Sequence, residues 1–220
     1  MVTSSLLLPL EQHKVVVIIR GIAPAYMSDL FQALYDGGIR MAEITLNSEH
    51  ALESISMMRK AYDGRMMVGA GTVLNEASAK DAIAAGAQFL VSPNVDEGMI
   101  RYAVANGVLP LPGAMTATEV VQAVRFGSPV VKIFPCSSLG PNYIKELKGP
   151  LNDIPMLAVG GINEDNVAAY MKAGAIGVGI GGSMVNKEWI HSGRFDLIRD
   201  YATMLRASMG IMETIIDTHT

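Results

Sequence analysis

Short runs of β-branched and aliphatic residues recur along the chain, and stretches with helical apolar spacing, such as Leu30, Ala33 and Leu34, separate them. Apolar positions three and four residues apart line one face of a helix. Short continuous apolar runs are typical of strands that are buried on both faces. The pattern predicts eight strands, over residues 15–20, 40–45, 66–69, 88–91, 108–111, 130–134, 156–159 and 176–180.

Glycine marks the boundary between a predicted helix and the strand that follows it. Gly64, Gly86, Gly107 and Gly127 are 22, 21 and 20 residues apart, and the last three stand just before strand runs. Glycine at such a place supplies the left-handed residue that ends a helix. The spacings are close to the minimum for one strand and one helix, so the repeat is a strand–helix unit.

Eight alternating units predict a single (β/α)8 barrel, the TIM barrel of the α/β class. A doubly wound open sheet is the alternative, but the count of eight and the absence of Gly-x-Gly-x-x-Gly after the first strand disfavour it. We expect one domain over residues 1–220, with a short N-terminal segment before the first strand. The last helix should begin near Arg194 and run past Leu205, followed by a C-terminal tail of uncertain order.

The composition restricts partners and location. Half of the 220 residues are hydrophobic and 17% are charged, so the chain can bury a large core. A net charge of −4 without basic clusters argues against nucleic acid as a partner. A single cysteine, Cys136, excludes an intramolecular disulfide. The apolar run 6–10 lacks a basic flank and is too short to span a membrane, so we expect a cytoplasmic protein without a membrane partner.

Lys132 stands between Val131 and Ile133 in an apolar strand run, where an ammonium group is costly unless it is paired or its pKa is lowered. Because side chains alternate along a strand, the two apolar neighbours face the helices and Lys132 points into the barrel. The same alternation directs Glu43 inward from the second strand. A neutral amine attacks carbonyl groups to form a Schiff base, and a nearby carboxyl group can move protons. The alternative is a buried ion pair with a structural role only.

Glycine-rich turns follow the predicted seventh and eighth strands. Loops at this place in a barrel commonly bind phosphate, because glycine lets backbone N–H groups approach an anion. The alternative is that the glycines only permit tight turns. Together with the inward amine, these turns predict a substrate with a ketone at one end and a phosphate at the other. The expected phosphate site consists of Gly160, Gly161, Gly182 and Ser183.

The histidines give no support to a metal site. His13, His50, His191 and His219 are not at strand ends or at ligand spacing, so we expect no metal. A phosphosugar isomerase or epimerase would share the phosphate loops without needing Lys132. A non-catalytic sensor of a phosphorylated ligand would bind without turnover. The residues alone leave these alternatives open.

Six separated motifs occur in order along the chain. They are Ala42-Glu-Ile-Thr-Leu-Asn-Ser48, Gly69-Ala-Gly-Thr-Val73, Val91-Ser-Pro-Asn94, Pro112-Gly113, Val131-Lys-Ile-Phe-Pro135 and Ala158-Val-Gly-Gly161. The chain therefore resembles the 2-keto-3-deoxy-6-phosphogluconate (KDPG) aldolase family over nearly its whole length. The resemblance implies a metal-independent aldolase that forms a lysine imine with pyruvate, uses no cofactor, acts on a phosphorylated keto acid and assembles as a homotrimer.

The resemblance also assigns roles to single residues. Lys132 is similar to the Schiff-base lysine, Glu43 to the general acid–base, and Thr72 to the threonine beside the pyruvyl carboxylate. Pro93, in the third motif, and Phe134 fall in the substrate site, where Phe134 would help to keep water from the imine. The family phosphate site coincides with the glycine-rich turns described above.

Asn47 departs from the family pattern, because many relatives have an arginine at this position that can pair with a carboxylate. Arg20 ends the first predicted strand and can reach the same anion from the neighbouring strand. A guanidinium is well suited to bidentate carboxylate binding, so Arg20 is the candidate. The alternative is an arginine on the surface at the strand exit.

Val159 bears on the choice of substrate. The phosphogluconate branch of the family more often has threonine here, and several motifs of this chain resemble the 2-keto-3-deoxy-6-phosphogalactonate (KDPGal) branch slightly more. The two substrates differ in configuration at C4, and a lost hydroxyl removes a hydrogen bond to the sugar. The predicted reaction is cleavage of phosphogalactonate or phosphogluconate to pyruvate and glyceraldehyde 3-phosphate. Cleavage of 4-hydroxy-2-oxoglutarate is an alternative.

Overall fold

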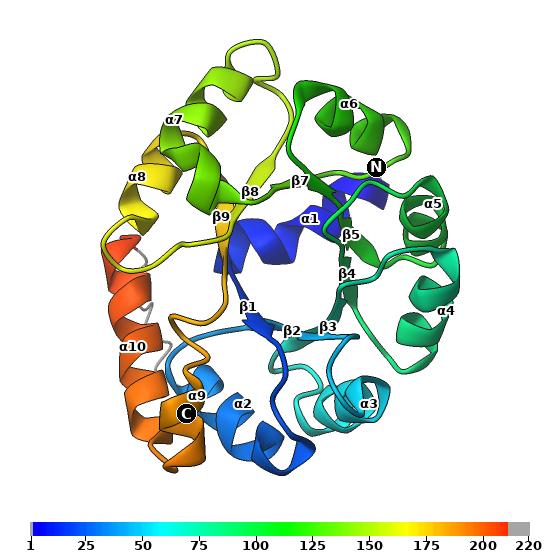
Figure 1. Cartoon of the computed structure of the whole chain (residues 1–220). Coiled ribbons are helices and arrows are strands. Elements are labelled where there is room, and N and C mark those ends of the chain that lie inside the picture. Colours follow the sequence, from blue (N-terminus) through cyan, green and yellow to red (C-terminus); the bar gives the residue numbers. More distant parts are fainter. Residues whose placement is uncertain (1, 211–220) are drawn as a thin grey trace, which may run out of the picture.

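Parallel strands follow one another around a ring in the computed structural model, which describes residues 2–210 (Figure 1). The C-terminal tail expected beyond residue 210 lies outside the described residues. Nine strands form one sheet in the order β5-β4-β3-β2-β1-β9-β8-β7-β6. They are β1 (Val15–Ile19), β2 (Met41–Thr45), β3 (Met67–Gly71), β4 (Phe89–Val91), β5 (Leu109–Leu111), β6 (Gly113–Ala114), β7 (Val131–Ile133), β8 (Met156–Val159) and β9 (Gly177–Ile180).

The ninth strand arises where the ring closes. The sequence pattern predicts one strand at this place, over residues 108–111, which corresponds to β5, and the structure adds the short strand β6 on the other side of Pro112. Proline has no N–H to donate to a ladder, so it interrupts the strand. Its carbonyl still accepts a hydrogen bond from the N–H of Lys132 at 2.9 Å. The nearly closed ring of parallel strands with alternating helices confirms the predicted barrel.

Helices surround the ring and connect successive strands (Figure 1). Thr116 and Glu119 form a capping box at the start of α6, and Asn75 and Ser78 form one at α4. The helices are α1 (Val2–His13), α2 (Met27–Asp36), α3 (Ala51–Ala61), α4 (Glu76–Ala84), α5 (Glu97–Ala105), α6 (Ala117–Arg125), α7 (Cys136–Lys148), α8 (Val167–Lys172), α9 (Lys187–His191) and α10 (Phe195–Ser208), with a short 3-10 turn η1 (Pro24–Tyr26).

Two apolar layers follow from the alternation of side chains. Ala42, Ile44, Val131 and Ile133 pack in the layer between the sheet and the helices. The second layer fills the barrel interior, and its members are Val16, Met41, Phe89, Val91, Leu109, Leu111, Val130, Leu157 and Val159. The sequence prediction of which side chains on β2 and β7 face outward is confirmed.

α1 closes the amino-terminal end of the barrel, behind the ring in Figure 1. Leu7 and Leu10 are buried and belong to the interior cluster, together with residues at the starts of β1 and β2. The N-terminal segment expected before the first strand is therefore a helix that covers the barrel floor. In the described residues 2–210, none of the helices is long and apolar enough to cross a membrane.

We expect Leu10→Ala to lower the free energy of unfolding by about 2–4 kcal/mol, because Leu10 is fully buried against the barrel floor. Leu8→Ala is the matched control on the same helix, since Leu8 is 58% exposed, and it should change stability by less than about 0.5 kcal/mol. Urea denaturation of both variants measures this. Equal effects of the two substitutions would show that α1 does not seal the barrel.

Candidate active site

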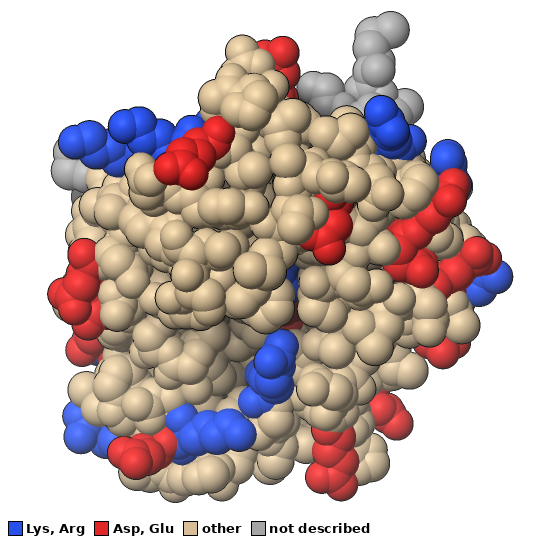
Figure 2. All heavy atoms as spheres, turned by 45° about the horizontal axis from the view of Figure 1, so that its top comes forward, with Lys and Arg blue, Asp and Glu red and all other residues tan. Residues whose placement is uncertain are grey.

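A cavity of about 770 Å³ opens at the carboxyl ends of β1, β7, β8 and β9. Figure 2 shows a hollow near the centre of this face, with basic atoms inside it and beside it. Glu43, Thr72 and Pro93 are predicted site residues that are not among its lining residues. The predicted residues that line the cavity are Arg20, Lys132, Phe134, Val159, Gly160, Gly161, Gly182 and Ser183.

Lys132 lies in the middle of β7, with its side chain inside the barrel and only 6% of the residue exposed. Its Nζ is 4.5 Å from the centroid of the Phe134 ring. Burial lowers the pKa of Lys132, because desolvation disfavours the charged amine, and the positive charge of Arg20 acts in the same direction. The carboxyl group of Glu43 opposes this shift. The neutral, nucleophilic form of the amine is therefore favoured relative to an exposed lysine.

Glu43 is 2% exposed, and burial raises its pKa to about 7, although the charges of Lys132 and Arg20 act against the shift. Its Oε2 atom is buried without a hydrogen-bond partner in the structure. A Cβ atom on Gly71 would come within 2.6 Å of this carboxyl group, so only glycine leaves room for it. The Glu43 carboxyl group therefore lies over the end of β3. With a pKa of about 7, it can donate or accept a proton near neutral pH.

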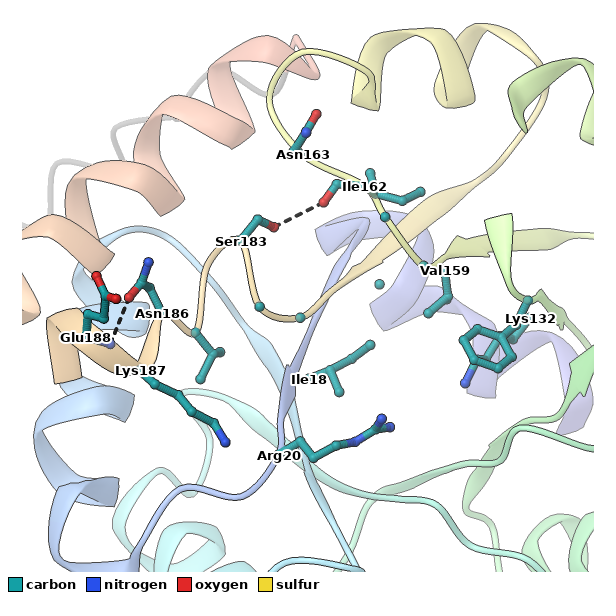
Figure 3. A pocket seen from close by; sticks show the side chains of 17 residues that line it. Ile18, Arg20, Lys132, Val159, Ile162, Asn163, Ser183, Asn186, Lys187 and Glu188 are labelled. Atoms are coloured by element: carbon teal, nitrogen blue, oxygen red, sulfur yellow. Dashed lines mark hydrogen bonds between the residues drawn. The ribbon is translucent and has the colours of Figure 1, made fainter. Parts of the chain in front are cut away.

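Arg20 follows β1 directly, and its side chain extends into the cavity although the residue is exposed (Figure 3). The next residue is anchored, because the N–H of Gly21 donates to Ser48 Oγ at 2.8 Å. Ser48 Oγ is in turn 2.9 Å from Thr45 Oγ1 at the end of β2. The charge of Arg20 affects the pKa values of both Lys132 and Glu43. The structure therefore brings together the three charged residues that the sequence singled out.

The glycines of the expected phosphate site are needed for different structural reasons. Gly160 and Gly161 have φ values of +106° and +69°, and Cβ atoms on them would meet the start of α7 at 3.2 and 2.7 Å. These two glycines are needed for the turn and for its packing. A Cβ atom on Gly182 would meet nothing within 4 Å, so its missing side chain leaves open space. Ser183 lies beside it, and its hydroxyl donates to the Ile162 carbonyl at 3.1 Å.

Thr72 and Pro93 lie at the ends of β3 and β4, outside the lining of the cavity. Thr72 has φ +58°, a left-handed conformation that costs a β-branched residue about 1–3 kcal/mol and is found mainly at functional sites. A Cβ atom on Gly113 would come within 2.6 Å of the Pro93 carbonyl, and Gly113 is paired with Lys132 in the sheet. Thr72 therefore directly follows Gly71, against which the Glu43 carboxyl group packs. Pro93 lies beside Gly113, the sheet partner of Lys132.

Several residues of the site were missed by sequence analysis. Ile18 lines the cavity two residues before Arg20 on β1, and strand alternation could have placed it there. Gly71 carries a weak signal, since glycine inside a strand often marks a close approach of another group. Asn186, Lys187 and Glu188 also line the cavity, and no sequence pattern indicates this. Within residues 2–210, no group of three or more His, Cys, Asp or Glu residues is arranged to hold a metal ion.

Comparison with known proteins identifies the family of this barrel. The family model for KDPG and KHG aldolase, where KHG is 2-keto-4-hydroxyglutarate, matches residues 8–201. The chain is 39% identical over 170 residues to 2-dehydro-3-deoxy-6-phosphogalactonate aldolase of Escherichia coli (strain K12), covering 77% of this chain and 83% of that protein. It is 35% identical over 185 residues to 2-dehydro-3-deoxy-phosphogluconate aldolase of Treponema pallidum (strain Nichols), covering 83% and 87%.

The fold agrees with these matches. A solved native KDPGal structure superimposes with a TM-score of 0.83 at 35% identity, covering 88% of this chain and 93% of that chain. The resemblance seen in the six sequence motifs is thus confirmed over most of the chain. The chain belongs to the KDPG and KHG aldolase family, and it is an aldehyde-lyase.

Proposed function

We propose that the protein cleaves a 2-keto-3-deoxy-6-phospho sugar acid to pyruvate and glyceraldehyde 3-phosphate through an imine on Lys132. The observation that carries the proposal is a buried amine of lowered pKa at one end of a cavity whose other end is formed by glycine-rich turns. The relatives named above act on the phosphogalactonate and phosphogluconate forms of this substrate. Comparing kcat/KM for the two epimers decides which one this chain prefers.

The first half of the reaction forms the imine. The neutral Lys132 amine attacks the C2 ketone of the substrate, and the resulting carbinolamine loses its hydroxyl as water. Glu43, acting directly or through a water molecule, donates the proton that this leaving hydroxyl needs. The protonated imine then carries a positive charge at the carbon–nitrogen bond. Phe134 lies over the Lys132 amine and restricts the access of bulk water to it.

The second half breaks the carbon–carbon bond. Glu43, now a carboxylate, accepts the proton of the C4 hydroxyl, and the C4–C3 bonding electrons move into the imine to form an enamine. Glyceraldehyde 3-phosphate leaves with the new C4 aldehyde. Glu43 returns its proton to C3 of the enamine, and water hydrolyses the protonated imine to release pyruvate and the free amine, with the proton set free in this step passing back to Glu43. The imine serves as the electron sink, so this route requires no metal or cofactor.

The remaining site residues bind and orient the substrate in this proposal. Arg20 pairs with the carboxylate, and Thr72 and Pro93 complete the pyruvyl side of the site. Val159 lines the cavity wall, and in this proposal it faces the sugar carbons between the keto group and the phosphate. An isomerase or epimerase would use the same cavity without an amine on β7. The phosphate is placed on the carboxyl-end turns, at Gly160, Gly161, Gly182 and Ser183.

Treatment with pyruvate and borohydride should attach a reduced pyruvyl group to Lys132, because borohydride traps the imine as a stable amine. Mass spectrometry of the digested protein locates the adduct. Lys132→Ala should abolish both the adduct and sugar-acid cleavage, whereas Lys145→Ala, on the exposed face of α7, should retain both. An active wild-type enzyme that yields no adduct on Lys132 would exclude the imine mechanism.

The value of kcat/KM should fall as the pH increases through about 7, because the free enzyme needs a protonated Glu43 to expel the carbinolamine hydroxyl and burial raises the pKa of Glu43 to about 7. Glu43→Gln should lower kcat by about 10²- to 10⁴-fold and remove this inflection from the remaining activity. Glu97→Gln, on the surface of α5, should leave the profile unchanged. An inflection that persists in Glu43→Gln would belong to another group, such as Lys132.

We further propose that the chain works in the cytoplasm as a homotrimer, as the family resemblance implies. Exposed apolar side chains are available for burial between copies, including Leu52 and Met57 on α3. Light scattering should then give a mass of three times the chain mass of 23.4 kDa. A mass equal to one chain at micromolar concentration would contradict the proposal.

A further inference from the structure

Lys187 lies at the start of α9, directly after the glycine-rich turn that follows β9. Its side chain lines the cavity and extends toward the loop after β1, next to Arg20 (Figure 3). The Nζ atom is 3.3 Å from the position that a Cβ atom on Gly21 would occupy. Gly21 has φ +62° and no side chain, so the ammonium group rests close to the backbone there.

The backbone around Lys187 is held from three sides. The Asn186 side-chain oxygen accepts hydrogen bonds from the N–H groups of Glu188 at 2.9 Å and Trp189 at 3.2 Å. The Trp189 ring packs 6.2 Å from the Tyr201 ring of α10. The ring of His191 is 5.7 Å from that of Tyr26, in the loop after β1. These contacts fix α9 against both neighbours, so the Lys187 side chain is directed into the cavity by a rigid support.

The carboxylate that lines the cavity is not an ion-pair partner of Lys187 in the described residues. In the described part of the chain, Arg20, Lys132 and Lys187 are the cationic residues that line the cavity, and Glu188 is the one carboxylate. Among the described residues Lys187 takes part in no ion pair. Figure 3 shows the Glu188 carboxylate turned away from the side on which Lys187 and Arg20 lie. An ammonium group held in this way attracts an anion that enters the cavity.

The substrate supplies such an anion at the matching end. In the proposed reaction Lys132 forms the imine, and Arg20 pairs with the carboxylate. The phosphate would then rest on Gly182 and Ser183, which offer hydrogen bonds but no full positive charge. Lys187 lines the cavity from the same segment after β9 as Gly182 and Ser183, and in Figure 3 it lies at the end away from Lys132, with its side chain directed toward Arg20. Neutral donors bind a phosphate dianion without neutralising its charge, and an ammonium group beside it adds a charge-assisted hydrogen bond.

We propose that Lys187 binds the phosphate group and sets the preference of the enzyme for phosphorylated over unphosphorylated keto acids. This inference rests on the proposed function, since it assigns the phosphate end of the same substrate. A hydrogen bond between charged groups contributes about 10- to 100-fold in affinity. The contribution is made equally to the bound substrate and to the transition state, because the phosphate does not react. It therefore acts on KM.

The experiment compares the wild type with Lys187→Gln, Lys187→Arg and the surface control Lys145→Gln. The substrates are the better-cleaved 2-keto-3-deoxy-6-phospho sugar acid and the same sugar acid without phosphate. Lys187→Gln should raise KM for the phosphorylated substrate about 10- to 100-fold with kcat within about twofold of wild type. The kinetics of the unphosphorylated substrate should not change. Lys187→Arg should restore most of the affinity, and Lys145→Gln should behave as wild type.

Two further measurements separate this inference from the proposed function. Inorganic phosphate should inhibit the wild type more strongly than Lys187→Gln, while pyruvate should form the borohydride adduct on Lys132 equally in both. An unchanged KM in Lys187→Gln, or an equal loss with both substrates, would overturn the role of Lys187 and leave the imine mechanism standing. If the wild type forms no adduct, the proposed function fails. Calorimetric titration with inorganic phosphate then still tests Lys187, and equal binding by both proteins would refute it.

Discussion

The removal of Lys132 and Glu43 from water shifts their two pKa values toward each other. Burial lowers the pKa of the amine and raises that of the carboxyl group to about 7, so Glu43 can exchange protons near neutral pH. Their mutual attraction opposes each shift, and Arg20 adds a further positive charge that favours the neutral amine. A proton can therefore pass between substrate and Glu43 at small cost while Lys132 remains a nucleophile.

This arrangement depends on parts of the molecule far from the amine. The interior apolar side chains and α1 fill the barrel beneath Lys132 and surround it with groups that do not solvate a charge. Gly71 provides the space in which the Glu43 carboxyl group lies, at the end of a neighbouring strand. Water reaching the barrel floor, or a side chain at position 71, would change the pKa values without touching the amine. Stability and catalysis thus share the same closed, apolar interior.

The sequence could predict the barrel and the buried, inward positions of Lys132 and Glu43 because both follow from local pattern. Alternation on β2 and β7 requires only neighbouring residues to place Glu43 and Lys132 inside. Three features could not be predicted in this way. They are the separate strand β6 after Pro112, the covering of the barrel floor by α1, and the position of Lys187 in the cavity wall. Each depends on which distant segments meet when the ring closes, and spacing along the chain does not contain that information. The glycines also show what sequence cannot distinguish. Gly161 and Gly182 both stand in glycine-rich turns, but Gly161 packs tightly against the start of α7 and Gly182 borders open space.

The separation of charges along the cavity gives the substrate a single productive direction. A keto acid phosphate carries an anion at each end, and the cavity offers cations near both ends. Lys132 competes less for either anion than an exposed lysine would, because burial lowers its pKa. In the proposed binding mode the anion of smaller charge lies beside Arg20, because the planar guanidinium matches a carboxylate. In the proposed binding mode the bulkier dianion lies at the open turn at Gly182, so a reversed substrate would place the phosphate beside Phe134 and the Lys132 amine.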